Sequence, residues 1–148
     1  MMYVIPIDFA TPAFEETLAL RRKILRIPLG LTFELKDIAQ EYQDYHLACY
    51  SAEAELLACL VLTVKDYKRI KMRQVAVDDT IQSKGVGTFL VKACEDFCRN
   101  LGFERIVLNA RDTAVEFYEK LDYDKVGEPF EEVTIKHFKM EKVLKGKG

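Results

Sequence analysis

The sequence lacks the long apolar runs and the strong charge bias that mark membrane proteins and nucleic-acid binders. No apolar stretch approaches the roughly 18 residues of a membrane span, and the net charge is only −2 over 148 residues. A domain dedicated to nucleic acid is usually strongly basic. We therefore expect no nucleic-acid partner and no membrane association. The chain also opens without a basic leader and apolar core, so we expect no signal peptide.

Paired cysteines are missing as well. Cys49, Cys59, Cys94 and Cys98 form no CxxC pair, and the histidines near them do not give zinc-finger spacing. Cys94 and Cys98 are one helical turn apart, which is typical of small buried hydrophobic residues. We expect no metal site and a reducing compartment, the cytoplasm.

The length and the apolar content fit one domain over residues 1–148. In the first half, a strand is expected over Tyr3–Ile7, followed by a helix over residues 11–25 that Thr11 caps. A short helix is expected around Leu35–Glu41. Three strands follow, and their short connections predict antiparallel pairing; they cover His46–Tyr50, Leu56–Val64 and Ile70–Val77.

The second half begins with a strong helical pattern over Gly85–Leu101, with Gly102 as its terminator. Its expected apolar stripe consists of Val86, Leu90, Ala93, Phe97 and Leu101. A buried strand over residues 105–110, a short helix opened by a Thr113–Glu116 capping box, and strand-like segments over residues 123–130 and 133–143 complete the chain. The pattern predicts a mixed α/β (α+β) layered domain. Its central twisted sheet should be mixed and mostly antiparallel, with flanking helices and one parallel crossover between residues 70 and 108.

The loop Gln82–Gly87, with the sequence QSKGVG, stands at the start of the long helix. It matches no Walker A motif, and it lacks the third glycine of a dinucleotide fingerprint. Unpaired N–H groups and the helix dipole favour an anion at such a position. A flexible turn without a ligand explains the same residues equally well.

Two further segments resolve that ambiguity: the strand end Val75-Ala76-Val77, and LNARDTAVEFYEKLDY with its Asn109, Phe117 and Tyr118. In this order and spacing, the three segments resemble the core of the GNAT superfamily of acyl-CoA-dependent N-acetyltransferases. The resemblance is strongest from about Val75 to Glu128, and the preceding order of elements fits it.

The resemblance implies that acetyl-CoA is the co-substrate and that an amine of a small molecule or peptide is the acceptor. Main-chain groups of Val75, Ala76 and Val77, beside a bulge, would hold the pantetheine arm and the thioester. Asn109 would bind the pantetheine, and Phe117 would line its channel. The pyrophosphate would lie against Gln82, Ser83, Lys84, Gly85, Val86, Gly87 and Thr88.

For catalysis, the resemblance implies that Tyr118 protonates the leaving thiolate. Packing in the core, on one helix face with Val115 and Leu121, is the alternative for this tyrosine. The strand IKMRQVAV lacks the glutamate that many members use as the base. A water chain, or a residue from elsewhere, would then have to take the proton. The segment GEPFEEVTIKHFKM resembles that of family members with a histidine near the acceptor pocket, which makes His137 a candidate residue of the acceptor site and His46 a weaker one. The missing glutamate also keeps open a non-catalytic acyl-CoA-binding or regulatory domain.

Two charged clusters leave the charge of the acceptor undecided. Lys65, Lys68, Arg69, Lys71 and Arg73 would attract an acidic molecule, whereas Glu128, Glu131 and Glu132 would attract a cationic amine. The basic cluster could equally attract the 3′-phosphate of the cofactor. Solvated surface is the simpler explanation of both clusters. A homodimer is left open.

Overall fold

In a computed structural model, the described residues are 1–31, 33–82 and 84–145. The chain divides into two units, Met1–Thr63 with Gln74–Cys94 and Val64–Arg73 with Glu95–Gly148. The expectation of one domain over residues 1–148 stays a prediction. None of the described helices is long and apolar enough to cross a membrane.

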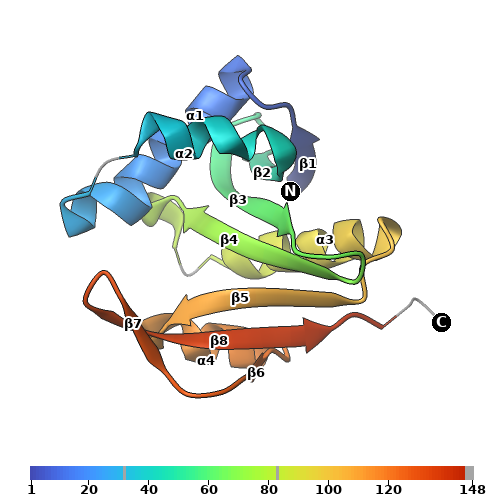
Figure 1. Cartoon of the computed structure of the whole chain (residues 1–148). Coiled ribbons are helices and arrows are strands. Elements are labelled where there is room, and N and C mark those ends of the chain that lie inside the picture. The colour runs from blue at the N-terminus through green and yellow to red at the C-terminus, as the bar shows by residue number, and fades with distance from the viewer. Residues whose placement is uncertain (32, 83, 146–148) are drawn as a thin grey trace. The chain divides into compact units, whose positions relative to one another are not determined.

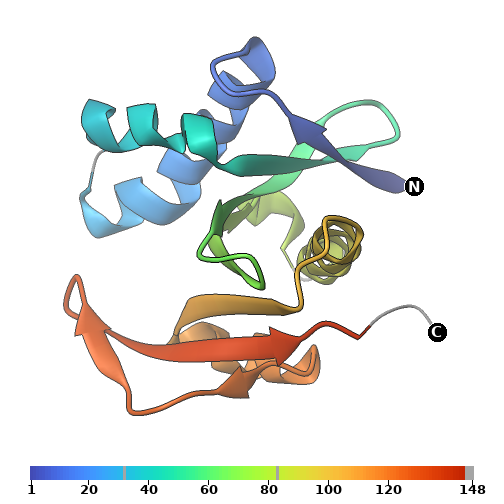
Figure 2. The same ribbon diagram turned by 45° about the vertical axis from the view of Figure 1, so that its right-hand side comes forward.

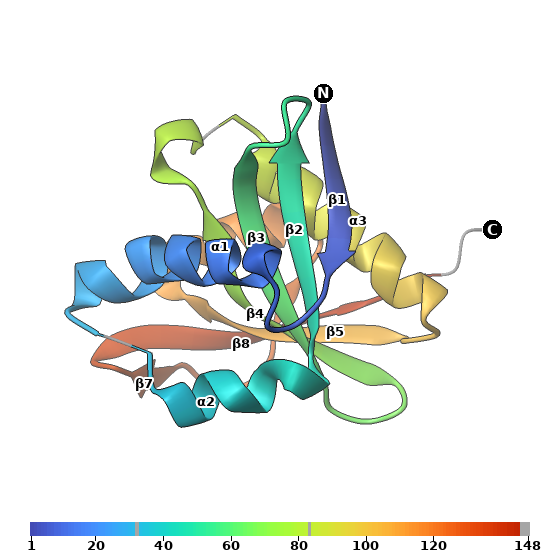
Figure 3. The same cartoon turned by 90° about the horizontal axis from the view of Figure 1, so that it is seen from above.

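The first unit contains three neighbouring strands with a helix across them. The strands β1 (Met2–Ile7), β2 (Tyr45–Ser51) and β3 (Leu56–Val64) pair in that order, and both pairings are antiparallel. Figure 3 shows helix α1 (Pro12–Arg21) crossing these strands. The second half of β4 (Arg69–Val77) also belongs to this unit. The antiparallel pairing predicted for β2 and β3 is confirmed.

Helix α1 begins as its sequence predicts. The Thr11 hydroxyl accepts a hydrogen bond from the Phe14 N–H at 3.3 Å, and proline stands in the first helical turn. The expected continuation to residue 25 is only partly right, because Arg22–Arg26 form a π-helical turn, η1. A short 3-10 helix over Ile27–Leu29 follows, and α2 covers Leu35–Gln40, close to the predicted short helix.

The second unit is built around β8 (Ile135–Val143), which Figures 1 and 2 show beside β5 (Arg105–Arg111). Three strands pair with β8, and all three pairings are antiparallel. They are β5, β6 (Asp124–Lys125) and β7 (Phe130–Glu132). The start of β4 pairs with β5 in parallel over Arg69–Lys71. Helix α4 (Val115–Lys120) precedes β6. These pairings confirm a mixed, mostly antiparallel sheet with one parallel crossover.

Helix α3 (Val86–Asn100) buries a different face from the one predicted. Val86 and Leu90 are buried as expected, but Leu101 is 44% exposed and Ala93 and Phe97 are only half-buried. The fully buried side chains are Leu90, Val91, Cys94 and Cys98. The buried face is therefore rotated toward the cysteines, whose small volume suits a close-packed layer.

Three local predictions are wrong or only partly right in the second unit. Helix α4 has Ala114 as its N-cap with no side-chain cap, so the Thr113–Glu116 capping box does not form. The segment from Val133 is not strand throughout, because Val133 and Thr134 form a turn with φ of 53° and 59°. Residues 123–130 likewise contain only the two-residue β6 and the start of β7.

Candidate active site

The predicted site residues divide between the two units. Val75–Val77, Gln82 and Lys84–Thr88 lie in the first unit, whereas Asn109, Phe117, Tyr118 and His137 lie in the second. Ser83, also predicted to bind the cofactor, lies outside the described residues. Each group has a geometry of its own.

The strand end Val75–Val77 follows a backbone irregularity. Gln74 adopts φ of 54° inside β4, a left-handed conformation that is uncommon for any residue other than glycine. It stands immediately before the segment where the resemblance implies a bulge. The Gln74 Oε1 atom is buried and has no hydrogen-bond partner among the described residues. Ala76 is 1% exposed and packs with Leu20 and Cys59.

The turn after the strand end is held by side chains. Asp78 Oδ1 accepts hydrogen bonds from the backbone N–H of Thr80 at 3.0 Å and from its hydroxyl at 2.9 Å. These bonds lower the pKa of the Asp78 carboxyl. Gln82 Nε2 donates to the Val77 carbonyl at 3.1 Å. The glutamine side chain therefore ties the predicted phosphate loop to the predicted thioester strand, a contact that its sequence position did not reveal.

The loop reaches helix α3 through a glycine that the backbone requires. Gly85 has φ of 81°, and a Cβ built there would meet nothing within 4 Å. The Gly85 carbonyl accepts the Phe89 N–H at 3.0 Å. The N–H groups of Val86, Gly87 and Thr88 therefore precede the first bond of the helix, as in any helix N-terminus. Lys84 is exposed beside them.

In the second unit, Tyr118 lies among aromatic rings. It is 8% exposed, and its ring meets Phe117 edge-on at 5.0 Å and Tyr123 at 5.6 Å between centroids. Val115 and Leu121 are buried too, as core packing would require. Asp122 adopts the left-handed conformation directly after this helix, with φ of 71°.

Asn109 and His137 are carried by neighbouring strands. Asn109 is exposed on β5, and its register partner on β8 is Lys139. His137 pairs in register with Arg111 of β5 and with Phe130 of β7. Its Nδ1 lies 2.8 Å from the Ile135 carbonyl, and its ring stacks on Phe130 at 5.6 Å. His137 is thus held on one side and half-buried.

His46, the weaker candidate, has the contacts of a structural residue. It is 4% exposed, its Nε2 lies 3.0 Å from the Glu41 carbonyl, and its ring meets Phe14 edge-on at 4.9 Å. These contacts account for the buried ring without any ligand.

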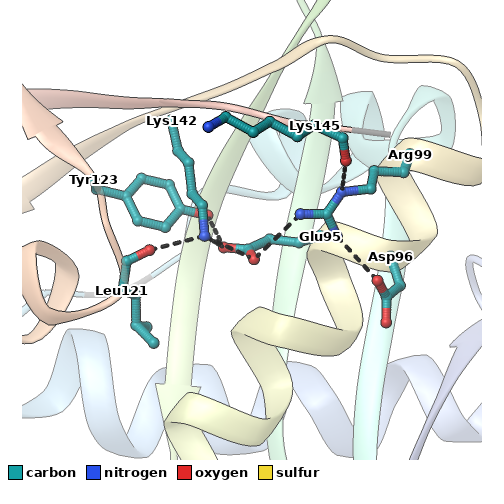
Figure 4. A network of polar contacts seen from close by, with 7 residues as sticks. All are labelled: Glu95, Asp96, Arg99, Leu121, Tyr123, Lys142 and Lys145. Atoms are coloured by element: carbon teal, nitrogen blue, oxygen red, sulfur yellow. Dashed lines mark hydrogen bonds and ion pairs between the residues drawn. The ribbon is translucent and has the colours of Figure 1, made fainter. Parts of the chain in front are cut away.

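A polar network that the sequence analysis did not predict surrounds Glu95, as Figure 4 shows. Glu95 is 4% exposed; it accepts the Tyr123 hydroxyl at 2.9 Å and lies 3.1 and 3.2 Å from the Lys142 ammonium. Lys142 also donates to the Leu121 carbonyl at 2.9 Å. Tyr123 also contacts the ring of Tyr118, so the network helps to hold the aromatic rings around Tyr118 in place. A glutamate directly after the buried Cys94 was the only hint in the sequence.

Comparison with known proteins shows the family of the chain. A family model described as "Acetyltransferase (GNAT) domain" matches residues 32–144. CgeE of Bacillus subtilis (strain 168), named as an uncharacterized N-acetyltransferase, is 37% identical over 84 residues, which cover 53% of this chain and 32% of that protein. The chain thus aligns with about a third of the length of that relative.

Two solved structures share the fold. An N-acetyltransferase candidate from Lactobacillus plantarum has a TM-score of 0.82 at 23% identity, covering 97% of this chain and 98% of its own. A GNAT family acetyltransferase from Elizabethkingia anophelis, solved with acetyl-CoA bound, has a TM-score of 0.75 at 17% identity, again covering 97% and 98%.

Proposed function

The chain belongs to the GNAT superfamily of acetyl-CoA-dependent N-acetyltransferases, and on that premise we propose that it moves an acetyl group from acetyl-CoA directly to a primary amine of a small molecule or peptide. The observation that carries the proposal is the loop from Gln82 to Gly85, tied to Val77 and opening onto the N-terminus of α3. Four free cysteines suit a reducing compartment, for which we propose the cytoplasm.

The loop suits a pyrophosphate on three grounds. Gly85 leaves open space where a side chain would stand, so a phosphate oxygen can approach the main chain. The first-turn N–H groups of Val86, Gly87 and Thr88 supply donors at the positive end of the helix dipole. Lys84 supplies a charge. We assign these residues, with Gln82 and Ser83, to the diphosphate of the cofactor.

Val75, Ala76 and Val77 are assigned to the pantetheine arm and the thioester. Gln74 interrupts the regular backbone conformation of the strand just before them, and an interruption of this kind can leave main-chain groups unpaired for a ligand. A main-chain N–H near Val77 would stabilise the oxyanion that forms as the amine attacks the carbonyl carbon. Asn109 and Phe117 are assigned to pantetheine by the family pattern alone.

Tyr118 is assigned the role of general acid. As the C–N bond forms and the C–S bond breaks, a thiolate leaves and needs a proton. The reference pKa of a tyrosine hydroxyl in model peptides is about 10, and such a group can donate a proton to a thiolate whose parent thiol has a reference pKa of about 8.5. The buried setting of Tyr118 limits competition from water, and Phe117 and Tyr123 restrict its rotation.

The proton that the amine loses needs another route, because the strand before Val75 carries no carboxylate. We propose His137 for an acceptor-site role in this step. Its Nδ1 is engaged by the Ile135 carbonyl, which fixes the ring and leaves Nε2 as the atom available for the acceptor.

Release of free thiol tests the proposal. The protein is incubated with acetyl-CoA and a panel of primary amines, and free CoA is measured. We expect amine-dependent release for at least one class of acceptor. The competing function is a non-catalytic acyl-CoA-binding domain, favoured by the missing glutamate. Tight CoA binding without release across the panel would support that alternative.

A further inference from the structure

A cluster of three arginines in the first unit surrounds a single aromatic ring. The guanidinium carbons of Arg21, Arg22 and Arg26 lie 4.9, 5.9 and 4.7 Å from the centroid of Phe33. Guanidinium groups stack well on aromatic faces, and stacking leaves their N–H edges directed outward for other partners. Three like charges at one ring nevertheless repel one another unless anions compensate them.

Only one carboxylate compensates this cluster among the described residues. Glu41 receives Arg21 NH1 at 2.8 Å and NH2 at 2.7 Å, and both side chains are almost fully buried. Arg22 and Arg26 have no ion pair in the described part of the chain. Two of the three positive charges therefore remain available to a ligand.

Two buried hydrogen-bond donors in the cluster also lack partners. The Nε atoms of Arg21 and Arg26 are buried and have no hydrogen-bond partner in the described structure. A buried N–H group without a partner is costly, and its presence calls for an explanation. Arg21 is already committed to Glu41, whereas Arg26 is half-buried and Arg22 is exposed. The last two can therefore reach a molecule that arrives from solvent.

Arg22 and Arg26 are carried by the π-helical turn η1, which directly follows Arg21 at the end of α1, and this turn packs next to the candidate thioester strand. Ile24 and Leu25 lie against the core cluster that contains Ala76. Lys23 pairs with Asp78 at 3.6 Å and with Asp79 at 3.0 Å, directly after the strand end. π-helical turns often occur at functional sites. All of these contacts lie within the first unit.

We propose that Arg22 and Arg26, stacked on Phe33, bind an anionic group of the acceptor, so that the substrate is a primary amine that also carries a carboxylate or a phosphate. This inference rests on the proposed acetyl transfer. Arginine matches the planar geometry of carboxylate and phosphate with paired hydrogen bonds. Bound there, the anion would hold the acceptor beside the strand that we assign to the thioester.

Paired acceptors test the proposal in turnover. An amino acid is compared with its amide, and O-phosphoethanolamine with ethanolamine, so that each pair differs in the anion and the two pairs separate carboxylate from phosphate. We expect kcat/KM to favour the anionic member. In Arg26→Gln and Arg22→Gln, that preference should fall roughly 10- to 100-fold, mainly through KM. Arg26→Lys, which keeps the charge but not the paired donors, should restore part of it.

Lys36→Gln is the matched control, because Lys36 is an exposed cation on α2 in the same unit. It removes the same charge without touching the ring cluster, so the preference should survive. Equal kcat/KM for the members of both pairs, or an equal loss in Lys36→Gln, would overturn the inference. Acetylation of the acceptors that lack the anion would still be measured in that case. This inference can therefore fail while the proposed acetyl transfer is upheld.

A binding measurement covers the case in which no acceptor of the panel turns over. The melting temperature of each protein is measured with and without glutarate or inorganic phosphate, at constant ionic strength. Saturating CoA is present throughout to occupy the phosphate loop. We expect stabilisation of the wild type and of Lys36→Gln, and its loss in Arg22→Gln and Arg26→Gln. The same anion response in all four proteins refutes the arginine site.

Discussion

The clearest test of the second unit is the substitution Glu95→Gln, which keeps the shape of a buried side chain and removes its charge. Glu95 is 4% exposed and receives the Tyr123 hydroxyl and the Lys142 ammonium. Hydrogen bonds to charged groups contribute about 1.5–3 kcal/mol, and breaking a buried pair costs about 3–5 kcal/mol. Lys142 keeps 19% exposure and its bond to Leu121, so water offsets part of the loss.

We therefore expect Glu95→Gln to reduce the free energy of unfolding by about 2–3 kcal/mol, toward the lower end of those ranges. For a chain of this length, the melting temperature should fall by roughly 4–12 °C. Urea unfolding followed by far-UV circular dichroism is the assay, because the sequence contains no tryptophan to report on the transition.

Glu116→Gln provides the matched control. Glu116 forms an ion pair with Lys120 at 3.3 Å, but the side chains are 82% and 74% exposed. Solvent screens such pairs, so we expect no measurable change. Tyr123→Phe removes one donor to Glu95 and should cost about 1 kcal/mol. If Glu95→Gln is no more destabilising than Glu116→Gln, the network in Figure 4 does not stabilise the fold and the reasoning is wrong.

Further predictions address the site and the backbone. Tyr118→Phe should lower kcat by roughly 10²–10⁴ where chemistry limits the rate, with little change in CoA affinity; an unchanged kcat in single-turnover kinetics would exclude the acid role. Gly87→Glu should abolish CoA binding in calorimetry by bulk and like charge, and normal affinity in a folded variant would rule out the phosphate loop. Burial raises the pKa of the Cys59 thiol to about 12, so iodoacetamide at pH 8.5 should spare Cys59 in the native protein and alkylate it in urea; rapid native labelling, read by mass spectrometry, would contradict this. Replacing Val133 and Thr134 by Asn and Gly should raise the free energy of unfolding by about 1–2 kcal/mol, since both native residues occupy left-handed backbone; a loss of stability in urea would argue against that turn.

Much of the fold was predictable because its signals act over a few residues. Thr11 caps the helix that starts at Pro12, and Gly102 ends helix α3 with φ of 93°. The Phe103 N–H closes the helix on the Cys98 carbonyl at 3.1 Å, as this kind of terminus requires. The short connection between β2 and β3 allows only antiparallel pairing, which is what forms.

Local reasoning failed where distant neighbours decide. The stripe predicted for α3 included Phe97 and Leu101, but the buried face carries Cys94 and Cys98. A helical pattern with apolar residues on more than one face does not show which face the protein covers. The same limit explains why no role was predicted for Glu95, whose partners Tyr123 and Lys142 are distant in the chain.

The sequence by itself determined the order of most elements and the family, and it predicts which segments would bind the cofactor, because each depends on local backbone chemistry and on motif spacing. Only the tertiary structure decided how side chains meet across the chain. Arg21 finds Glu41 across 20 positions, and Lys142 finds Glu95 across 47. Such partners cannot be read from spacing, since burial and the approach of separate elements select them. The arginine cluster on Phe33, and with it the proposed charge of the acceptor, emerges only at that level.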